Sequence, residues 1–149
     1  MCPGVRRERE LPPGSEVPAE PDWLDPAPAG LHDHLDRALG TRTSAVVQAV
    51  CAALDAGRGG DEDYQDALQG SSAYYLDDDD ASAVFDGPVA VVTGAQDRVV
   101  GTADQLRRMA VYPRGTYLAA DLAGHYLPFE RPALLRSTAL DWLQRCGVG

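Results

Sequence analysis

The apolar run Val89–Val92 constrains this chain more than any other feature of its sequence. Pro88 and Gly94 bound the run, and a short uninterrupted apolar segment is typical of a strand buried on both faces of a parallel sheet. A second strand is expected at residues 116–120, and the residues between the two strands have a helical pattern up to about Ala110. Two parallel strands joined by a helical crossover are therefore predicted.

Two helices are expected to accompany these strands. Thr102 and Gln105 stand three residues apart and predict a capping box at the start of the crossover helix. Pro132 suits the first position of a last helix. An apolar stripe follows it at helical spacing, formed by Leu135, Ala139, Leu143 and Cys146. The expected fold class is α/β, with a small parallel sheet, flanking helices and a further helical region before them.

Three regions are predicted along the chain. Residues 1–30 hold seven of the 11 prolines, and proline removes a backbone donor and restricts its predecessor, so this arm should be extended or disordered. Residues 31–83 should form a helical region and an acidic linker, with Ser44 as the N-cap of a helix that Gly57 ends and a short helix at 62–68. Residues 84–149 carry the strongest strand and helix patterns, so the core is expected there.

Composition excludes several classes of partner. The 149 residues have a formal net charge of −10, and four consecutive acids stand at Asp77–Asp80, so the surface should repel nucleic acid and anionic lipid. No apolar run approaches the roughly 20 residues of a membrane span, and the start lacks the apolar core of a signal peptide. The three cysteines, Cys2, Cys51 and Cys146, show no paired spacing, which favours reduced thiols and a cytoplasmic location.

Two patterns invite a metal site and are better explained without one. Asp77–Asp80 lacks the alternating ligands and the glycine turn of a calcium loop, so a solvated linker is the favoured interpretation. His32 and His34 are two residues apart in an expected helix and point to different sides, with no further ligand nearby. No metal or organic cofactor is predicted.

Asp97 and His125 each follow one of the two expected strands. Because functional groups of parallel sheets gather beyond the carboxyl ends of the strands, both side chains are expected at the same edge. A carboxylate that accepts the Nδ1 proton of a histidine fixes its tautomer and stabilises its cation, as a general base requires. The structural alternative is that Asp97 only begins a turn and His125 only fills a polar loop after Gly124. Spacing alone leaves both interpretations open.

A longer run of motifs favours the catalytic interpretation. In chain order, residues 84–146 contain a strand, a G-x-x-D segment ending at Asp97, a helix, Tyr112-Pro113, a strand, Ala123-Gly124-His125, Glu130 before Pro132, and a helix ending in Trp142-Leu143. This order resembles the closing section of α/β-hydrolase-fold enzymes. The resemblance implies that Asp97 is the triad acid and His125 the triad base.

The same resemblance extends more weakly to the rest of the chain. By chain order, residues 30–80 resemble the helical cap of such enzymes, whose aromatic side chains can line a substrate pocket. The candidates here are Trp23, Tyr64, Tyr74 and Tyr75, although aromatics at irregular spacing more often serve packing. Glu130 is expected to act as a dipole and cap partner of the last helix rather than as a site residue.

The family's nucleophile stands in a G-x-S-x-G motif on an earlier strand-to-helix turn, and no such motif occurs in these 149 residues. Ser15, Ser71 and Ser72 follow no apolar strand, and Cys51 and Cys146 fall in or at the end of expected helices. None of them is predicted to act as a nucleophile.

Three functional hypotheses follow. The first is a C-terminal part of a serine hydrolase that cleaves ester, amide or C–C bonds of a small-molecule substrate only when the nucleophile-bearing half completes it. The second is a non-catalytic interaction module that pairs with itself or with another chain through unpaired sheet edges. The third is a gene product with no selected activity.

Overall fold

The computed structural model describes residues 10–14, 16–57, 59–71 and 85–148. In chain order the elements are the 3-10 helix η1 (Ala29–Leu31), α1 (His32–Ala38), α2 (Ser44–Ala56), α3 (Glu62–Gly70), β1 (Val89–Gly94), α4 (Ala103–Arg108), the 3-10 helix η4 (Met109–Val111), β2 (Gly115–Ala120), α5 (Leu127–Glu130) and α6 (Pro132–Arg145). Among these described residues, no helix is both long and apolar enough to cross a membrane.

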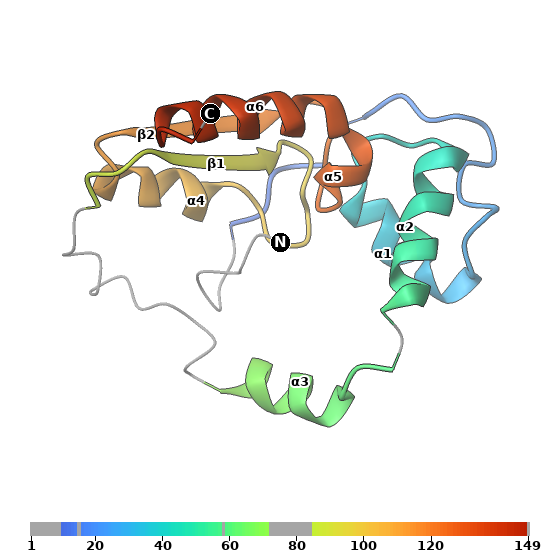
Figure 1. Ribbon diagram of the computed structural model, residues 1–149. Coiled ribbons are helices and arrows are strands. Elements are labelled where there is room, and N and C mark those ends of the chain that lie inside the picture. The colour runs from blue at the N-terminus through green and yellow to red at the C-terminus, as the bar shows by residue number, and fades with distance from the viewer. Residues whose placement is uncertain (1–9, 15, 58, 72–84, 149) are drawn as a thin grey trace.

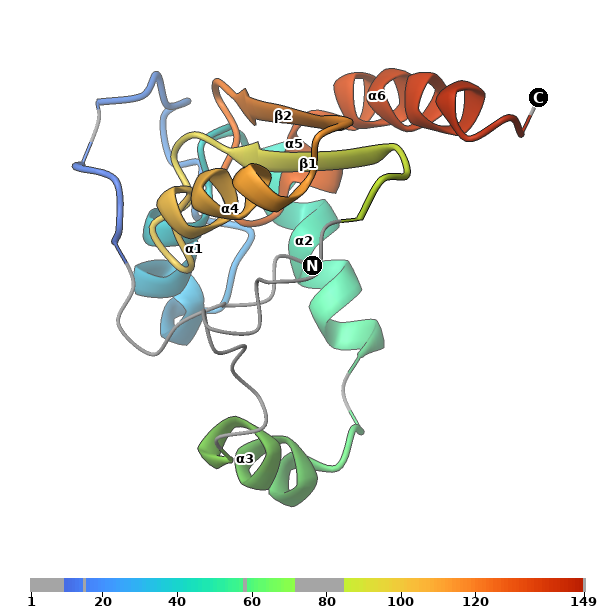
Figure 2. The ribbon, with the colours of Figure 1, turned by 90° about the vertical axis from the view of Figure 1, so that its left-hand side faces the viewer.

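The sheet in the described part of the chain consists of β1 and β2, which run parallel. Their register pairs Val89 with Gly115 at one end and Gly94 with Ala120 at the other. Helices α4 and η4 form the crossover, and Figures 1 and 2 show α6 along one face of the sheet and α4 along the other. The predicted mixed α/β class with a small parallel sheet and flanking helices is confirmed.

The structure corrects two predicted helix starts and confirms a third. Thr43, not Ser44, caps α2, because its side chain accepts a hydrogen bond from the Val46 amide at 3.3 Å. Thr102 stands at the N-cap of α4, but its side chain makes no capping bond. Its ψ of −20° lies outside the extended region that a capping side chain requires. Pro132 begins α6 as predicted.

The expectation of a core at the C-terminal end alone was wrong. One cluster lies between α1, α2 and the segment before them, and its buried members are Ala27, Leu35, Leu39, Val47 and Val50. A second, smaller cluster consists of Ala120, Ala123 and Leu127 and packs against side chains of β1, β2 and α6. The helical region has its own core because α1 and α2 each bury one apolar face, and α5 contacts α2.

The proline-rich arm is only partly as predicted. Ala19 forms an isolated parallel bridge with Arg42, and Trp23 packs against the helical cluster with the Arg42 guanidinium 5.2 Å from its ring centroid. The second half of the arm is therefore built into the fold.

Helix α3 lies apart from the sheet and from the other helices in both views (Figures 1 and 2).

The two predicted pocket aromatics that the structure describes, Trp23 and Tyr64, do not share a lining. Trp23 belongs to the helical cluster, and Tyr64 on α3 is 65% exposed. Tyr74, Tyr75, Ser72 and the acidic run Asp77–Asp80 lie outside the described residues, as do Cys2 and Ser15.

Candidate functional site

The two predicted site residues lie next to each other beyond the ends of the strands. Oδ2 of Asp97 lies 3.2 Å from Nδ1 of His125. The Asp97 side chain is 2% exposed and that of His125 is 20% exposed, so the carboxylate is enclosed while the imidazole reaches the surface. A distance of 3.2 Å is at the long end for a hydrogen bond.

The two carboxylate oxygens of Asp97 have different partners: one binds the backbone of the following turn and the other faces His125. Its Oδ1 accepts hydrogen bonds from the amides of Val99 at 2.8 Å and Val100 at 3.0 Å, which leaves Oδ2 for His125. The structural and catalytic interpretations of Asp97 are thus compatible. Burial raises the pKa of this carboxyl, but the hydrogen bonds from His125, Val100 and Val99 outweigh burial and hold the pKa below its ordinary value. The carboxylate is therefore ionised at neutral pH.

The loop that carries His125 is held on both sides. The His125 amide donates to the carbonyl of Ala38, the last residue of α1, at 2.6 Å. The amide of Ala123 donates to Oε1 of Gln96 at 3.1 Å, and the Gln96 amide donates back to the Ala123 carbonyl at 2.9 Å. Gln96 precedes Asp97, so these bonds join the loop after β1, which carries Asp97, to the loop after β2, which carries His125 and is called the base loop below.

Glu130 also holds the loop that carries His125, because it binds Gly124 in this loop and Gly40 after α1. This carboxylate is 7% exposed. Its Oε2 accepts from the amides of Gly40 at 2.6 Å and Thr41 at 2.8 Å, and its Oε1 accepts from the amide of Gly124 at 2.8 Å. The Thr41 hydroxyl adds a bond to the carbonyl of Leu122 at 2.5 Å. The N-cap of α6 is Arg131, whose side chain makes no capping hydrogen bond, and the bonds of Glu130 given above run to other segments instead of the predicted capping contact.

Glycines permit this close approach of backbones. A Cβ at Gly124 would overlap the carbonyl oxygen of Ala38, and a Cβ at Gly40 would lie 2.5 Å from the amide nitrogen of Ala123. Neither contact can be relieved by turning a side chain, because the opposing atoms are backbone. The segment after α1 and the base loop therefore pack directly against each other.

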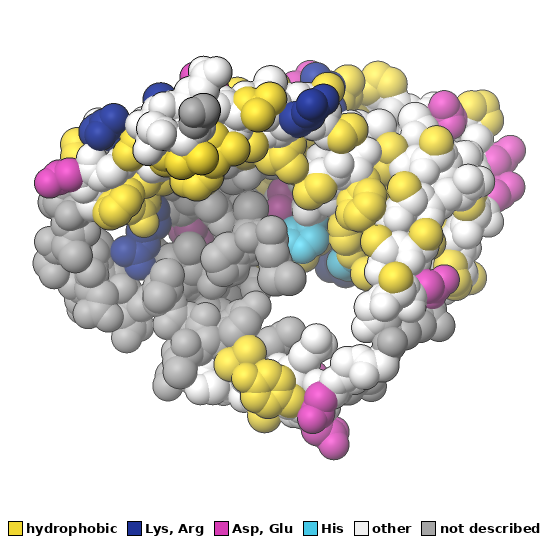
Figure 3. Space-filling model, viewed as in Figure 1, with side chains coloured by type: hydrophobic (Ala, Val, Ile, Leu, Met, Phe, Trp, Pro, Cys, Tyr) yellow, Lys and Arg dark blue, Asp and Glu magenta, His cyan; other side chains and the backbone are white. Residues whose placement is uncertain are grey.

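The ring of Tyr126 lies between His125 and His34 and contacts both. The ring of Tyr126 stands edge-on to His125 with centroids 5.4 Å apart, and edge-on to His34 with centroids 5.8 Å apart. The Tyr126 hydroxyl lies 2.9 Å from Nε2 of His34. Burial, and then the charges of His125 and Arg37, lower the pKa of His34, so this imidazole is neutral at pH 7. Figure 3 shows histidine surface in the hollow between the sheet and the α1–α2 region.

The structure describes three of the side chains considered as nucleophiles, Ser71, Cys51 and Cys146. Ser71 follows α3, which lies apart from the sheet (Figure 1). Cys51 packs within the helical cluster, where burial and then the Asp55 carboxylate raise the pKa of its thiol and reduce its reactivity. Cys146 follows the end of α6. In the described part of the chain, Nε2 of His125 has no hydrogen-bond partner.

The histidines proposed as metal ligands have other partners. Nε2 of His32 lies 3.1 Å from the carbonyl oxygen of Ala27, and His34 pairs with Tyr126. Within residues 10–14, 16–57, 59–71 and 85–148, no group of three or more His, Cys, Asp or Glu side chains has the arrangement of a metal site.

Sequence reasoning missed Glu130 and Gln96 as supports of the site. Glu130 binds Thr41 and Gly40, which stand 89 and 90 residues before it in the sequence. Gln96 binds Ala123, which stands 27 residues after it. A local pattern cannot report such contacts. The one available signal was the number of glycines around them, since Gly40, Gly94 and Gly124 each stand where backbones meet.

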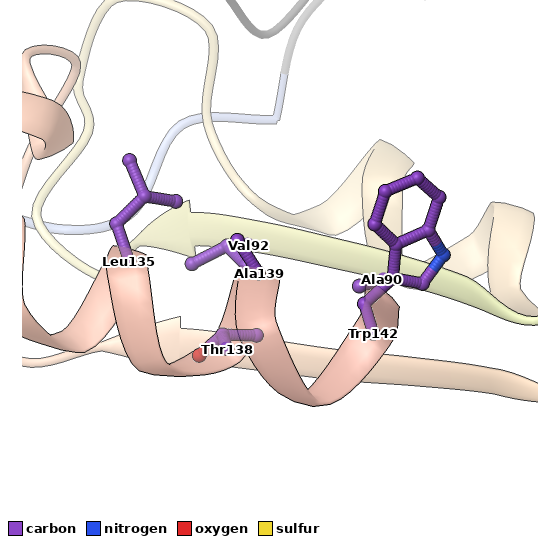
Figure 4. Close-up of a pocket in the computed structure, with 6 residues that line it drawn as sticks. All are labelled: Ala90, Val92, Leu135, Thr138, Ala139 and Trp142. Atoms are coloured by element: carbon purple, nitrogen blue, oxygen red, sulfur yellow. The ribbon is translucent and has the colours of Figure 1, made fainter. Parts of the chain in front are cut away.

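An open apolar groove of about 190 Å³ lies between β1 and α6, and neither Asp97 nor His125 lines it. Figure 4 shows side chains of β1 and α6 lining it, namely Ala90, Val92, Leu135, Thr138, Ala139 and Trp142. The indole Nε1 of Trp142 donates to the Pro88 carbonyl at 2.8 Å and fixes one end of the groove.

Comparison with known proteins finds no protein family, curated protein or solved structure that matches this chain. What the site can do follows from its chemistry. An imidazole whose Nδ1 faces a buried carboxylate is a general base that can take a proton, at Nε2, from a hydroxyl, a thiol or a water molecule.

Proposed function

We propose that this chain supplies the acid and base of an α/β-hydrolase-type serine hydrolase, with the nucleophile contributed by polypeptide outside these 149 residues. The observation that carries the proposal is the contact of 3.2 Å between Asp97 Oδ2 and His125 Nδ1 at the carboxyl ends of adjacent parallel strands. In the completed site, a serine would attack an ester, amide or C–C bond of a small-molecule substrate. His125 would accept the serine proton at Nε2, and Asp97 would orient the imidazole.

The electrostatics of the pair support this role. Asp97 stays ionised because its hydrogen bonds lower its pKa, and an ionised partner stabilises the imidazolium that forms when the base accepts a proton. A buried aspartate that only began a turn would need no histidine on its second oxygen. The exposure of His125 leaves its outer nitrogen accessible to a reacting group.

The small size of the sheet is a second argument that a further segment completes this fold. A two-stranded parallel sheet leaves both outer edges unpaired within the described residues, and parallel sheets are stable mainly when covered and extended. A nucleophile-bearing segment that pairs with an edge of this sheet would bring its strand end to the same side as Asp97 and His125.

The test is to isolate the natural polypeptide from its source cells with an antibody raised against this chain and to treat it with a fluorophosphonate probe. We expect the probe to label a serine in a G-x-S-x-G turn, located on the same polypeptide or on one bound to it. Introducing His125→Ala at the native gene should abolish that labelling, while His32→Ala should leave it intact. Absence of labelling in the natural protein would refute the proposal.

A second candidate is a non-catalytic interaction module, which the open groove beside β1 favours. Apolar surface next to an unpaired strand edge is a typical docking place for an added strand. If this candidate holds, the pure chain should self-associate or bind another chain, and Ala139→Glu in the groove should prevent this while His125→Ala does not. Light scattering of the two variants distinguishes it from the hydrolase.

A further inference from the structure

The carboxylate of Glu130 joins two segments that meet beside His125. One segment, Gly40-Thr41, follows α1 and gives two amides to Oε2, and the other gives the amide of Gly124 to Oε1. The residue after Gly124 is His125 itself, whose own amide donates to the carbonyl of Ala38, the last residue of α1. The backbone on which the imidazole stands is therefore clamped between α1 and Glu130.

We propose that Glu130 is a positioning residue for His125, which it holds in register with Asp97 by binding the amides of Gly40, Thr41 and Gly124. This inference deepens the proposed function, and its catalytic meaning rests on that function. The helical region, on this account, is a structural part of the site, because α1 and the segment after it fix the base loop.

The donor set shows why a carboxylate is needed at this position. Both oxygens of Glu130 face N–H groups, and a carboxylate is the side chain that accepts with both of its terminal atoms. A glutamine has one acceptor and one donor, so in either orientation its NH₂ group meets an amide donor. Glu130→Gln therefore breaks the clamp while it changes the size of the side chain very little.

The contacts of Glu130 also separate positioning from capping. The carboxylate lies in a short helix, α5, next to the start of α6, yet it accepts hydrogen bonds from the amides of Gly40, Thr41 and Gly124, which lie outside both helices. Glu20 offers a matched control, because its Oε2 accepts from the Ser44 amide at 3.1 Å at the exposed start of α2. Both residues bind backbone amides, but only Glu130 adjoins the base loop.

The experiment is nitrogen-15 and proton NMR of the histidine side chains in the 149-residue chain and its Glu130→Gln and Glu20→Gln variants. In the unmodified chain we expect His125 as the Nδ1–H tautomer, with a proton at Nδ1 that is shielded from solvent by Asp97. In Glu130→Gln we expect that proton to exchange about tenfold faster or more, together with the Gly124 amide. Glu20→Gln should match the unmodified chain in both signals.

The outcomes are decisive in both directions. A natively folded Glu130→Gln variant, judged by its amide spectrum, that keeps the His125 tautomer and slow Nδ1 exchange would overturn the inference. If Glu130→Gln does not fold, Glu130→Asp is measured instead: it keeps the charge but withdraws both oxygens by one methylene. Faster exchange at His125 in a folded Glu130→Asp supports positioning, and unchanged exchange overturns it. Since this measurement involves no nucleophile and no substrate, its failure is distinguishable from failure of the proposed hydrolase function.

Discussion

Gly94 and Gly124 pack backbone against backbone, so that a Cβ at Gly94 would overlap the carbonyl oxygen of Gly124. Gly94 ends β1 and Gly124 directly precedes His125. The end of the acid-bearing strand and the base loop are therefore in contact at a point where no side chain fits. This contact sets the spacing from which Asp97 and His125 reach each other.

Gly94→Ala is expected to lower the free energy of unfolding by about 1–3 kcal/mol, because an added methyl must displace fixed backbone atoms. Gly30→Ala is the matched control, since a Cβ there meets nothing within 4 Å. Urea unfolding followed by circular dichroism measures both. Equal unfolding midpoints for the two variants would show that the loop can move away from the strand and that the spacing is not fixed there.

Asp97→Asn should keep the turn and reverse the histidine tautomer. The asparagine carbonyl can still accept from Val99 and Val100, but its NH₂ group then faces Nδ1 of His125 and requires an acceptor there. His125 would carry its proton on Nε2, where it can no longer accept one from a nucleophile. Nitrogen-15 NMR of the side chain reports the tautomer directly, and in a completed enzyme the loss of turnover should be about 10⁴-fold.

Asp121→Asn is the control for that change, because Asp121 lies before the same loop and accepts from Gln96 Nε2 at 2.9 Å rather than from a histidine. Its variant should retain the Nδ1–H tautomer of His125. If Asp97→Asn also retains it, Asp97 does not orient the imidazole.

The adjacency of Asp97 and His125 was predictable from sequence, while the means of holding them there was not. The apolar run Val89–Val92 and the segment after Tyr112 identify parallel strands, and parallel register brings the strand ends together whatever the surrounding residues are. For Glu130, by contrast, the sequence offers only the neighbouring Pro132, which suggests a helix start. Its actual partners are 89 and 90 residues away in Thr41 and Gly40, and only the folded backbone brings them within reach.

The helix starts were also only partly predictable, because a capping residue type does not by itself fix where the backbone turns into the helix. Thr43 and Ser44 are both good capping residues, and the structure selects Thr43 because the chain turns one residue earlier. Thr102 and Gln105 have the spacing of a capping box, but the ψ of Thr102 excludes it. The helical core was missed because its members Ala27, Leu35 and Val50 come from three separate segments, which only the folded chain brings together.

The pKa values of the two buried carboxylates near His125, Asp97 and Glu130, should be shifted in opposite directions. For Asp97, the hydrogen bonds that lower the pKa outweigh burial, whereas burial raises the pKa of Glu130 although several amides oppose that rise. Carbon-13 NMR of the side-chain carboxyls should place the Asp97 midpoint below, and the Glu130 midpoint above, the ordinary value for each residue type. A Glu130 midpoint at or below the ordinary glutamate value would contradict this expectation.

Asp97 should also make the fold sensitive to acid. Its lowered pKa means that the unfolded chain binds its proton more tightly, so the stabilising contribution of Asp97 is complete above about pH 4–5 and is lost as the pH falls through the folded-state pKa. The difference in unfolding free energy between the unmodified chain and Asp97→Asn should therefore shrink on acidification below about pH 4. A difference that stays constant to pH 2 would mean that the folded-state pKa of Asp97 is not lowered.

His34 is expected to titrate below the ordinary histidine range and to respond to its neighbour. Burial is the largest cause of its lowered pKa, and the charge of His125 is the second. His125→Ala should raise the pKa of His34 without restoring it fully, because burial remains. Proton NMR titration of the ring signals measures this shift, with His32→Ala as the control that should leave His34 unchanged.

The isolated chain should not turn over a p-nitrophenyl ester, although its base is in place. Catalysis by a triad requires a nucleophile at Nε2 of His125, and in the described residues no hydroxyl or thiol is hydrogen-bonded there. The thiol of Cys51 is held protonated by burial, since its pKa is raised. We therefore expect the unmodified chain and His125→Ala to release p-nitrophenol at the same slow rate in a steady-state assay. Turnover that His125→Ala abolishes would show that the chain carries its own nucleophile, and Cys51→Ser and Ser71→Ala would then identify whether either of these side chains provides it.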